Sequence, residues 1–452
     1  MDILNAETRM DYVKCAAAIG LPVVMQNLVS SLVNTLDVFM LGQLGEVAIT
    51  ASAMGNQWFL LYLVLANGIA AAGAMFISQF WGKKDYVHIH NYTGILLIGA
   101  TALALVFMAV SAAVPERVIC LYSMDEAVIR EGTGYIRILS VCFLLYALNC
   151  TCATALRSIG ETRVPMAAAV VSLLCNTAGN CLLIFGLAGF PRMGIQGAAV
   201  STVFARTVEL AVSLGYILVK KPAIYGPVRE FVRIPREMTG RFFQYGALLI
   251  LGEVVYAVGN NLYNVAYKYT GTQAQASLQI ISTLQGIALL FCGGFGTAAA
   301  VMLGTLLGTG AFDQAKRCSR ILTAVSVLVG AGAGALTALA APALLSLFQI
   351  GAEARGYLRV MIVIMALSIP LRTVVYMVIC GILRSGGDNL HCFLANLVGV
   401  WCIGLPAVFL SAVVFGLPVY VVYAMAALEE AGKLLVCGPR ALKGKWLKNL
   451  TQ

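Results

Sequence analysis

Four polar residues follow one stripe of the first long apolar run, residues 21–42. Asn27, Ser30, Asn34 and Asp37 are spaced by three and four residues, which places them on one face of a helix. The run is long enough to cross a bilayer, where a carboxylate costs roughly 2.5–3.5 kcal/mol on insertion scales. We therefore predict that the stripe faces protein or water and that Asp37 is a functional residue. The alternative is that Asp37 only links neighbouring helices by hydrogen bonds.

A later apolar run repeats this stripe with its own carboxylate. Glu253, Tyr256, Asn260 and Asn264 follow the same helical spacing, but the acid lies at a different depth from Asp37. Buried carboxylates that face a cavity can bind a proton, a sodium ion or a cationic substrate. We predict that Glu253 has such a role in the second half of the chain, or else a structural hydrogen bond. The residues Asn34, Tyr256, Asn260 and Asn264 are predicted to line the cavity.

A pair of asparagines locates the expected ion site. Asn176 and Asn180 are four residues apart on one helix face, whereas the corresponding positions of the second half hold Ile403 and Ala407. Asparagine amides can hold the proton of an aspartate or complete a sodium shell of oxygens. This asymmetry favours a coupling site near Asp37, although hydrogen bonding between helices would explain the spacing equally well.

The composition predicts an integral membrane protein. The 452 residues are 60% hydrophobic and only 11% charged, whereas soluble domains contain about 25% charged residues. The polar start of the chain does not resemble a signal peptide, and the thirteen cysteines lie mostly in apolar runs, where they behave as small hydrophobes. We predict an all-α polytopic fold with twelve transmembrane helices, at residues 14–41, 50–80, 92–114, 133–155, 164–187, 195–219, 241–268, 276–307, 320–346, 357–383, 389–414 and 417–437.

The basic residues predict the topology. The net charge is +10, but Lys and Arg stand in short connections between the apolar runs, so we expect no nucleic-acid partner. With a cytoplasmic N-terminus, the inside segments hold roughly three times as many Lys and Arg as the outside segments. This count includes Lys433. We expect both termini in the cytoplasm and a multi-pass location in the plasma (inner) membrane.

The two halves of the chain resemble each other. A shift of 226 residues pairs Asn34 with Asn260 and Gly82 with Gly308, which indicates a duplicated six-helix unit. The predicted parts are an N-terminal lobe (1–219), a cytoplasmic linker (220–240), a C-terminal lobe (241–437) and a basic cytoplasmic tail (438–452). Two pseudo-symmetric six-helix lobes of equal orientation are typical of alternating-access transporters.

No enzyme motif is present. The sequence lacks a phosphate-binding Gly-x4-Gly-Lys-Ser/Thr segment and a nucleophile elbow, so we expect no cofactor and an ion gradient as the energy source. Arg206 and Glu209 are expected to form an ion pair, and Arg372 is an isolated cation in an apolar run. The three histidines are expected in loops without nearby carboxylates, which does not predict a metal site; they are His88, His90 and His391.

Several motifs together resemble the multidrug and toxic compound extrusion (MATE) family of bacterial transporters, over essentially the whole chain. They are Pro22 with Asp37-Val38-Phe39-Met40-Leu41-Gly42, Ala155-Leu156-Arg157-Ser158-Ile159-Gly160-Glu161-Thr162, Asn176-x3-Asn180-x5-Gly186, and Gly194-x2-Gly197-Ala198-Ala199-x2-Thr202. The resemblance implies two V-shaped lobes and antiport of amphipathic, usually cationic, compounds against protons or sodium.

The resemblance also implies roles for single residues. The first-lobe cation site of the family corresponds to Asp37, Asn176, Asn180 and Thr202, and a sodium ion there would be held by the first three. Pro22 matches the residue at which the first helix bends. Glu253 matches a glutamate of the NorM-type branch, but the aspartate of its tenth helix is replaced here by Thr373.

We therefore expect a monomeric, cation-coupled multidrug efflux antiporter that confers drug resistance and exports a small organic substrate through the bilayer. One alternative is a flippase or exporter of a lipid-linked or anionic metabolite with the same two-lobe architecture. Such a cavity should be lined by cations, for which only Arg206 and Arg372 are candidates. A channel-like or structural membrane protein is the third possibility.

Overall fold

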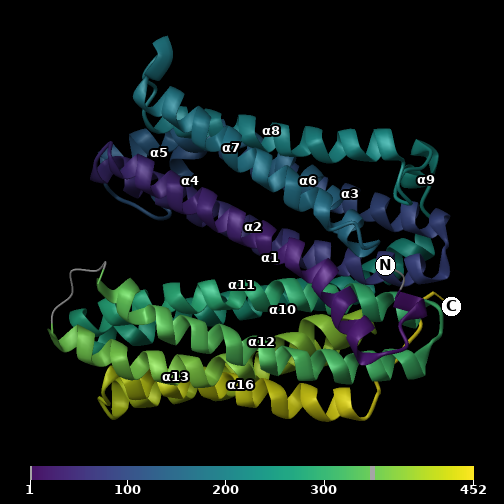
Figure 1. Cartoon of the computed structure of the whole chain (residues 1–452). Helices are drawn as coiled ribbons and strands as arrows, with labels where there is room; N and C mark the ends of the chain where they lie inside the picture. Colours follow the sequence, from purple (N-terminus) through teal and green to yellow (C-terminus); the bar gives the residue numbers. More distant parts are fainter. Residues whose placement is uncertain (1–2, 347–351, 452) are drawn as a thin grey trace. The chain divides into compact units, whose positions relative to one another are not determined.

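Long apolar segments bounded by Gly, Pro or charged residues form the helices of the computed structural model, which describes residues 3–346 and 352–451 (Figure 1). No strand occurs within these ranges. Eleven helical segments are long and apolar enough to cross a membrane, which confirms the all-α polytopic fold. They are α1 (Arg9–Gly42), α2 (Glu46–Lys83), α3 (Tyr86–Ala113), α6 (Val141–Ser158), α7 (Arg163–Phe185), α8 (Ile195–Lys220), α10 (Arg236–Tyr267), α11 (Thr272–Gly308), α12 (Phe312–Ser346), α13 (Ala352–Tyr376) continued by η4 (Met377–Leu383), and the run from α14 (Asn389–Asn396) to η6 (Leu410–Val414).

The predicted twelfth helix is α16 (Val419–Leu442), which has 24 residues but carries Glu429, Glu430 and Lys433. With α16 the helix count agrees with the predicted twelve. The predicted fourth helix, 133–155, was placed too early. It begins at Val141, because the preceding residues form a separate amphipathic helix, α5 (Glu126–Leu139).

Shorter elements connect these helices or interrupt them. The α14 to η6 run contains α15 (Leu405–Phe409) and wider π-helical turns at η5 (Leu397–Gly404) and η6, and η4 is a further π-helical turn. Such turns are often found at functional sites. The remaining short elements are η1 (Ile3–Asn5), α4 (Pro115–Cys120), η2 (Leu187–Gly189), α9 (Val228–Val232) and η3 (Lys268–Thr270).

The chain divides into two compact units. The first unit contains Met25–Ile77 and Asp85–Gly246, and the second contains Met1–Val24, Ser78–Lys84 and Ala247–Gln452. In the first unit α8 packs against α5, α6 and α7, and α6 also packs against α3. In the second unit α13 packs against α11, α12 and α16 (Figure 1). Helices α1, α2 and α10 each contribute residues to both units.

A reciprocal contact inside the second unit displays the duplication. A Cβ atom added at Gly82 would lie 2.1 Å from the backbone oxygen of Thr305, and one at Gly308 would lie 1.8 Å from the backbone oxygen of Gln79. The shift of 226 residues pairs Gly82 with Gly308 and Gln79 with Thr305. The ends of α2 and α11 therefore pack against each other through equivalent residues, which supports pseudo-symmetric halves. The close contact requires glycine on both helices.

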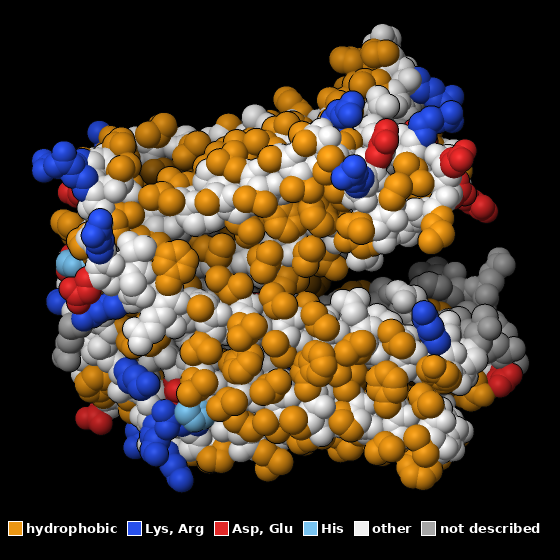
Figure 2. Space-filling view, turned by 180° about the vertical axis from the view of Figure 1, so that it is seen from behind, with side chains coloured by type: hydrophobic (Ala, Val, Ile, Leu, Met, Phe, Trp, Pro, Cys, Tyr) orange, Lys and Arg blue, Asp and Glu red, His pale blue; other side chains and the backbone are white. Residues whose placement is uncertain are grey.

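Hydrophobic side chains cover the flanks of the helices, and charged side chains gather towards the helix ends (Figure 2). Large apolar side chains are exposed on this surface; Leu339, for example, is 79% exposed and Leu367 is 76% exposed. A soluble surface rarely carries such a continuous apolar cover, so these flanks suit contact with lipid.

Candidate functional site

The first unit brings together all four residues of the predicted cation site. Asn180 Nδ2 lies 2.5 Å from Asp37 Oδ1 and 3.2 Å from Asn176 Oδ1. Asn176 Nδ2 in turn donates to Thr202 Oγ1 at 3.3 Å. Three helices, α1, α7 and α8, thus share one hydrogen-bonded chain that ends on the carboxylate.

Small residues allow α7 and α8 to approach closely enough for this chain. A Cβ atom at Gly179 would lie 2.4 Å from Ser201 Oγ, and one at Gly197 would lie 2.6 Å from the backbone oxygen of Leu183. Ser201 Oγ also donates to the backbone oxygen of Asn176 at 2.8 Å. The close helix contact therefore holds Asn176 in place, and its amide is left to bond with side chains.

The site borders a small cavity of about 120 Å³, lined by residues that include Asn34, Asp37, Asn176, Thr202 and Arg206. A water molecule occupies about 30 Å³ in the liquid, and drug-sized ligands need about 300 Å³ or more. This cavity suits an ion or a few waters, and an organic substrate would not fit inside it. Asn34 lies on the wall of this small cavity; its role in lining a substrate cavity stays a prediction.

One buried acceptor at this site has no partner in the described part of the chain. Asn180 is fully buried, its two side-chain hydrogen bonds both use Nδ2, and its Oδ1 accepts no hydrogen bond from a described residue. An unsatisfied buried acceptor is costly and calls for an explanation such as an ion or a water. Asp37 also forms no ion pair with any described residue. A carboxylate beside a free amide oxygen can take up a cation.

Arg206 does not neutralise Asp37, although both line the cavity. Its Nη1 lies 2.7 Å from Glu209 Oε2, as the spacing predicted, and its guanidinium lies 5.9 Å from the Tyr146 ring centre. Glu209 is buried, and its carboxylate neutralises the charge of Arg206 in this ion pair. Of the two carboxylates that line the cavity, Asp37 is the one without an ion-pair partner among the described residues.

Pro22 lies within α1, in the second unit, and the division between the units falls between Val24 and Met25. Proline removes a backbone hydrogen bond and weakens the helix locally. The helix that carries Asp37 therefore has its weak point close to the residue where it passes from one unit to the other.

Glu253 is not a free acid. Arg384 Nη2 lies 2.6 Å from Glu253 Oε1, and both side chains are largely buried. The sequence did not reveal this partner, because Arg384 lies in the short connection between the predicted helices 357–383 and 389–414. Tyr256 is half-buried on α10, whereas Asn260 and Asn264 are exposed there, so their cavity-lining role stays a prediction.

A buried cluster of charges in the second unit was missed. Glu429, Glu430 and Lys433 are between 4% and 6% exposed on α16, and Lys433 Nζ contacts Glu429 and lies 3.6 Å from Glu430 Oε1. Arg372 Nη1 lies 3.6 Å from Glu430, which supplies the partner that the sequence could not identify. Tyr263 Oη donates to Glu429 Oε2 at 2.7 Å.

The sequence did contain a signal for this cluster. Glu429 and Lys433 are four residues apart within an apolar helix, and such pairs face each other. Counting Lys433 as a topology signal was wrong, since the side chain is buried. Glycines in η5 make room for the cluster, because a Cβ atom at Gly404 would lie 2.0 Å from Tyr263 Oη and one at Gly399 would lie 2.5 Å from Lys433 Cγ.

The histidines were also misplaced. His90 is buried in α3, and its Nδ1 lies 2.5 Å from Glu230 Oε2, where the connection between α8 and α10 packs on α3. His88 contacts Asp85 and His391 contacts Asp388. Each histidine thus has a carboxylate partner, contrary to the prediction. No group of three metal-ligating side chains occurs among the residues that the structure describes.

The helical fold and a polar site buried among its helices define a membrane transporter, and comparison with known proteins supplies the family. The family model described as MatE matches residues 22–182 and 249–410. The chain belongs to the MATE family of multidrug efflux transporters, as the sequence motifs predicted.

Individual relatives agree. The chain is similar to the uncharacterized transporter YisQ of Bacillus subtilis, at 24% identity over 384 residues, covering 84% of this chain and 83% of the relative. It is 24% identical over 418 residues to the probable multidrug resistance protein NorM of Halalkalibacterium halodurans, covering 90% and 89%. A MATE transporter solved in an outward-facing conformation superposes with a TM-score of 0.88 at 16% identity, with 98% of each chain covered.

Proposed function

We propose that the protein is a cation-coupled efflux antiporter that exports amphipathic, cationic organic compounds by alternating access. The coupling ion, a proton or sodium, binds at Asp37, Asn176, Asn180 and Thr202. The observation that carries this proposal is the unpartnered, buried Asn180 Oδ1 beside a carboxylate that has no ion-pair partner among the described residues.

Either ion can be held by these groups with little rearrangement. In the present orientation the Asn180 amide donates to Asp37, which suits an ionised carboxylate. A protonated Asp37 has a hydrogen to donate, and Asn180 Oδ1 accepts it after a half-turn of the amide. The Asn176 amide must then turn as well, so that its Nδ2 replaces the lost hydrogen bond between the two asparagines. Sodium prefers oxygen ligands, which the carboxylate and the amide oxygens supply.

Antiport requires that ion and substrate weaken each other's binding, since each must favour a different state. Neutralising Asp37 removes the only acceptor charge at the end of the hydrogen-bonded chain, and α1 is the helix with Pro22. We propose that α1 bends near Pro22 when the ion binds. The transporter is proposed to act as a monomer in the inner membrane, with both termini in the cytoplasm.

The flippase alternative has less support. It requires cations that are free to bind an anionic group, whereas Arg206, Arg372 and Arg384 each face a carboxylate. A channel does not need negative coupling between two ligands.

The test is transport of a fluorescent organic cation into proteoliposomes under separate pH and sodium gradients. We expect uptake to depend on one gradient and Asp37→Asn to abolish that dependence while remaining folded. Glu126→Gln removes a similar charge from an exposed position of the first unit and should transport normally. Equal substrate affinity with and without the driving ion would contradict antiport.

A further inference from the structure

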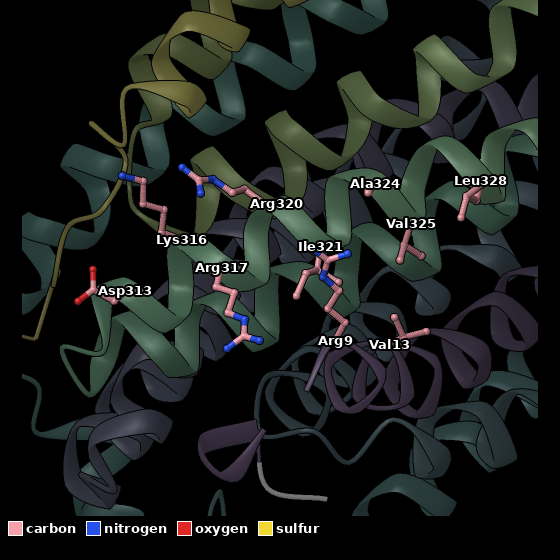
Figure 3. A pocket seen from close by; sticks show the side chains of 10 residues that line it. All are labelled: Arg9, Val13, Asp313, Lys316, Arg317, Arg320, Ile321, Ala324, Val325 and Leu328. Carbon is pink, nitrogen blue, oxygen red and sulfur yellow. The ribbon is translucent and has the colours of Figure 1, made fainter. Parts of the chain in front are cut away.

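Four cationic side chains line a pocket of about 750 Å³ between the start of α1 and α12, within the second unit (Figure 3). Arg9, Lys316, Arg317 and Arg320 are all exposed. Among the described residues none of the four forms an ion pair, and Asp313 is the acid that shares the lining. The pocket thus concentrates positive charge that the chain itself does not neutralise.

The same pocket becomes apolar further along α12. Its lining falls on two adjacent stripes at a spacing of four residues: Asp313, Arg317, Ile321 and Val325 on one, and Lys316, Arg320, Ala324 and Leu328 on the other. The charged residues occupy the first turns and the apolar residues the next turns. The distance along the helix from Arg320 to Leu328 is about 12 Å at 1.5 Å per residue, and Val13 adds apolar surface from α1.

A second groove adjoins the first across α12. It has a volume of about 690 Å³, and Lys316 and Arg320 line it as well. Its other walls are mostly apolar side chains of α13, η4 and α16, among them Leu371, Val374 and Leu434. In Figure 3 the side chains of Lys316 and Arg320 extend to one side of α12 and that of Arg317 to another. The cations therefore stand at the head of two apolar grooves.

We propose that these grooves bind an anionic phospholipid of the surrounding bilayer. Its phosphate is held by Arg9 and Arg317 in the first groove, with Lys316 and Arg320 at the head of the second, and its acyl chains lie along Ile321, Val325 and Leu328. Basic pockets between transmembrane helices bind anionic headgroups, and guanidinium groups bind phosphate oxygens in pairs. A soluble anion would use the charged turns alone and leave the apolar turns empty, so the change from charge to hydrocarbon along one helix face favours an amphiphile.

The site has a structural consequence. Arg9 belongs to α1 and the other cations belong to α12, so one bound headgroup connects the starts of both helices. Tyr12 of α1 and Cys318 of α12 already pack in the same core beneath it. The bound lipid is expected to stabilise the start of α1, and this holds whichever ion drives transport.

Lipid binding is measured by native mass spectrometry of the full chain in detergent, with phosphatidylglycerol, a diphosphatidylglycerol, phosphatidylcholine and glycerol 3-phosphate as separate probes. Both anionic lipids should bind, and the one with two phosphates more tightly. The triple variant Arg9→Gln/Arg317→Gln/Arg320→Gln should lose affinity at least tenfold. The control Lys443→Gln/Lys445→Gln/Lys448→Gln removes three exposed charges of the same unit and should change affinity less than twofold.

A second variant tests the acyl half without changing the charge. Ala324→Trp fills the apolar turns and should weaken lipid binding several-fold, and it serves if the triple variant fails to fold. Equal losses in the two triple variants would overturn the proposal in favour of general attraction between charges. Binding of glycerol 3-phosphate as tight as that of phosphatidylglycerol would overturn it in favour of a soluble anion.

Discussion

Replacing Lys433 by methionine should destabilise the second unit strongly. The side chain is 4% exposed, and its removal leaves Glu429 and Glu430 buried without their shared cation. Breaking a buried ion pair in this way costs about 3–5 kcal/mol. Glu430 keeps Arg372 at 3.6 Å and Glu429 keeps Tyr263 at 2.7 Å, so we expect the lower end, about 3 kcal/mol.

The assay is reversible unfolding of the purified protein in mixed micelles with increasing SDS. A loss of about 3 kcal/mol is a change of roughly 100-fold in the ratio of folded to unfolded protein. The neutral double variant Glu429→Gln/Lys433→Met removes both charges of the closest pair. It should recover most of the stability, because a buried pair replaced by neutral groups of similar volume is often close to neutral.

Two results would refute this reasoning. A Lys433→Met variant within about 0.5 kcal/mol of the parent, which is typical of surface substitutions, would mean that the cluster is hydrated or its carboxylates protonated. A double variant less stable than the single one would mean that each side chain contributes by its own packing, without coupling between the charges.

Three further predictions follow from other parts of the chain. Gly308→Ala should destabilise by about 1–3 kcal/mol, because α2 and α11 must separate, whereas Gly286→Ala in the same helix meets no atom within 4 Å and should be neutral in the same unfolding assay. At Asp388 burial raises the pKa of the carboxyl, but hydrogen bonds from Arg440 and His391 outweigh it and hold that pKa below its usual range; its contribution is therefore full above about pH 4 and lost below, and the stability difference between parent and Asp388→Asn should shrink on acidification. Pro22→Ala should slow ion-driven transport without lowering the thermal midpoint, and full transport activity would show that a bend there is not required.

The sequence predicted that Asp37, Asn176, Asn180 and Thr202 lie together, because part of the information is local. Their role in ion coupling stays a proposal. Asn176 and Asn180 share a helix face because they are four residues apart. The run 21–42 contains no charged residue other than Asp37. The small residues around Gly197 allow α7 and α8 to approach closely. The spacing could not predict that Asn180 donates both of its side-chain hydrogen bonds from Nδ2 and so leaves its Oδ1 without a partner among the described residues.

The partners of the second unit could not be predicted, because they are distant in the chain. Glu253 and Arg384 lie on different helices, 131 residues apart, and nothing in a single sequence pairs them. The reading of Lys433 as a cytoplasmic charge followed from its place near a run of basic residues. Lys433 can be buried on α16 because Gly399 of η5, which has no side chain, leaves room for it at the point of contact.

The difference between the two units bears on which acid couples to the ion. Glu253 lies 2.6 Å from Arg384, and an ion that bound there would have to displace a buried guanidinium. Asp37 accepts a hydrogen bond from the neutral amide of Asn180, and the nearby Arg206 is paired with Glu209, so a proton or sodium could neutralise Asp37 without breaking an ion pair. Exchange of an ion once per cycle is easier at an acid without an ion-pair partner, which favours the Asp37 site over the Glu253 site as the proposed coupling site. We therefore expect transport by the Asp37→Asn variant to lose its dependence on the ion gradient. The Glu253→Gln variant should instead lose stability, and its transport should still depend on the gradient.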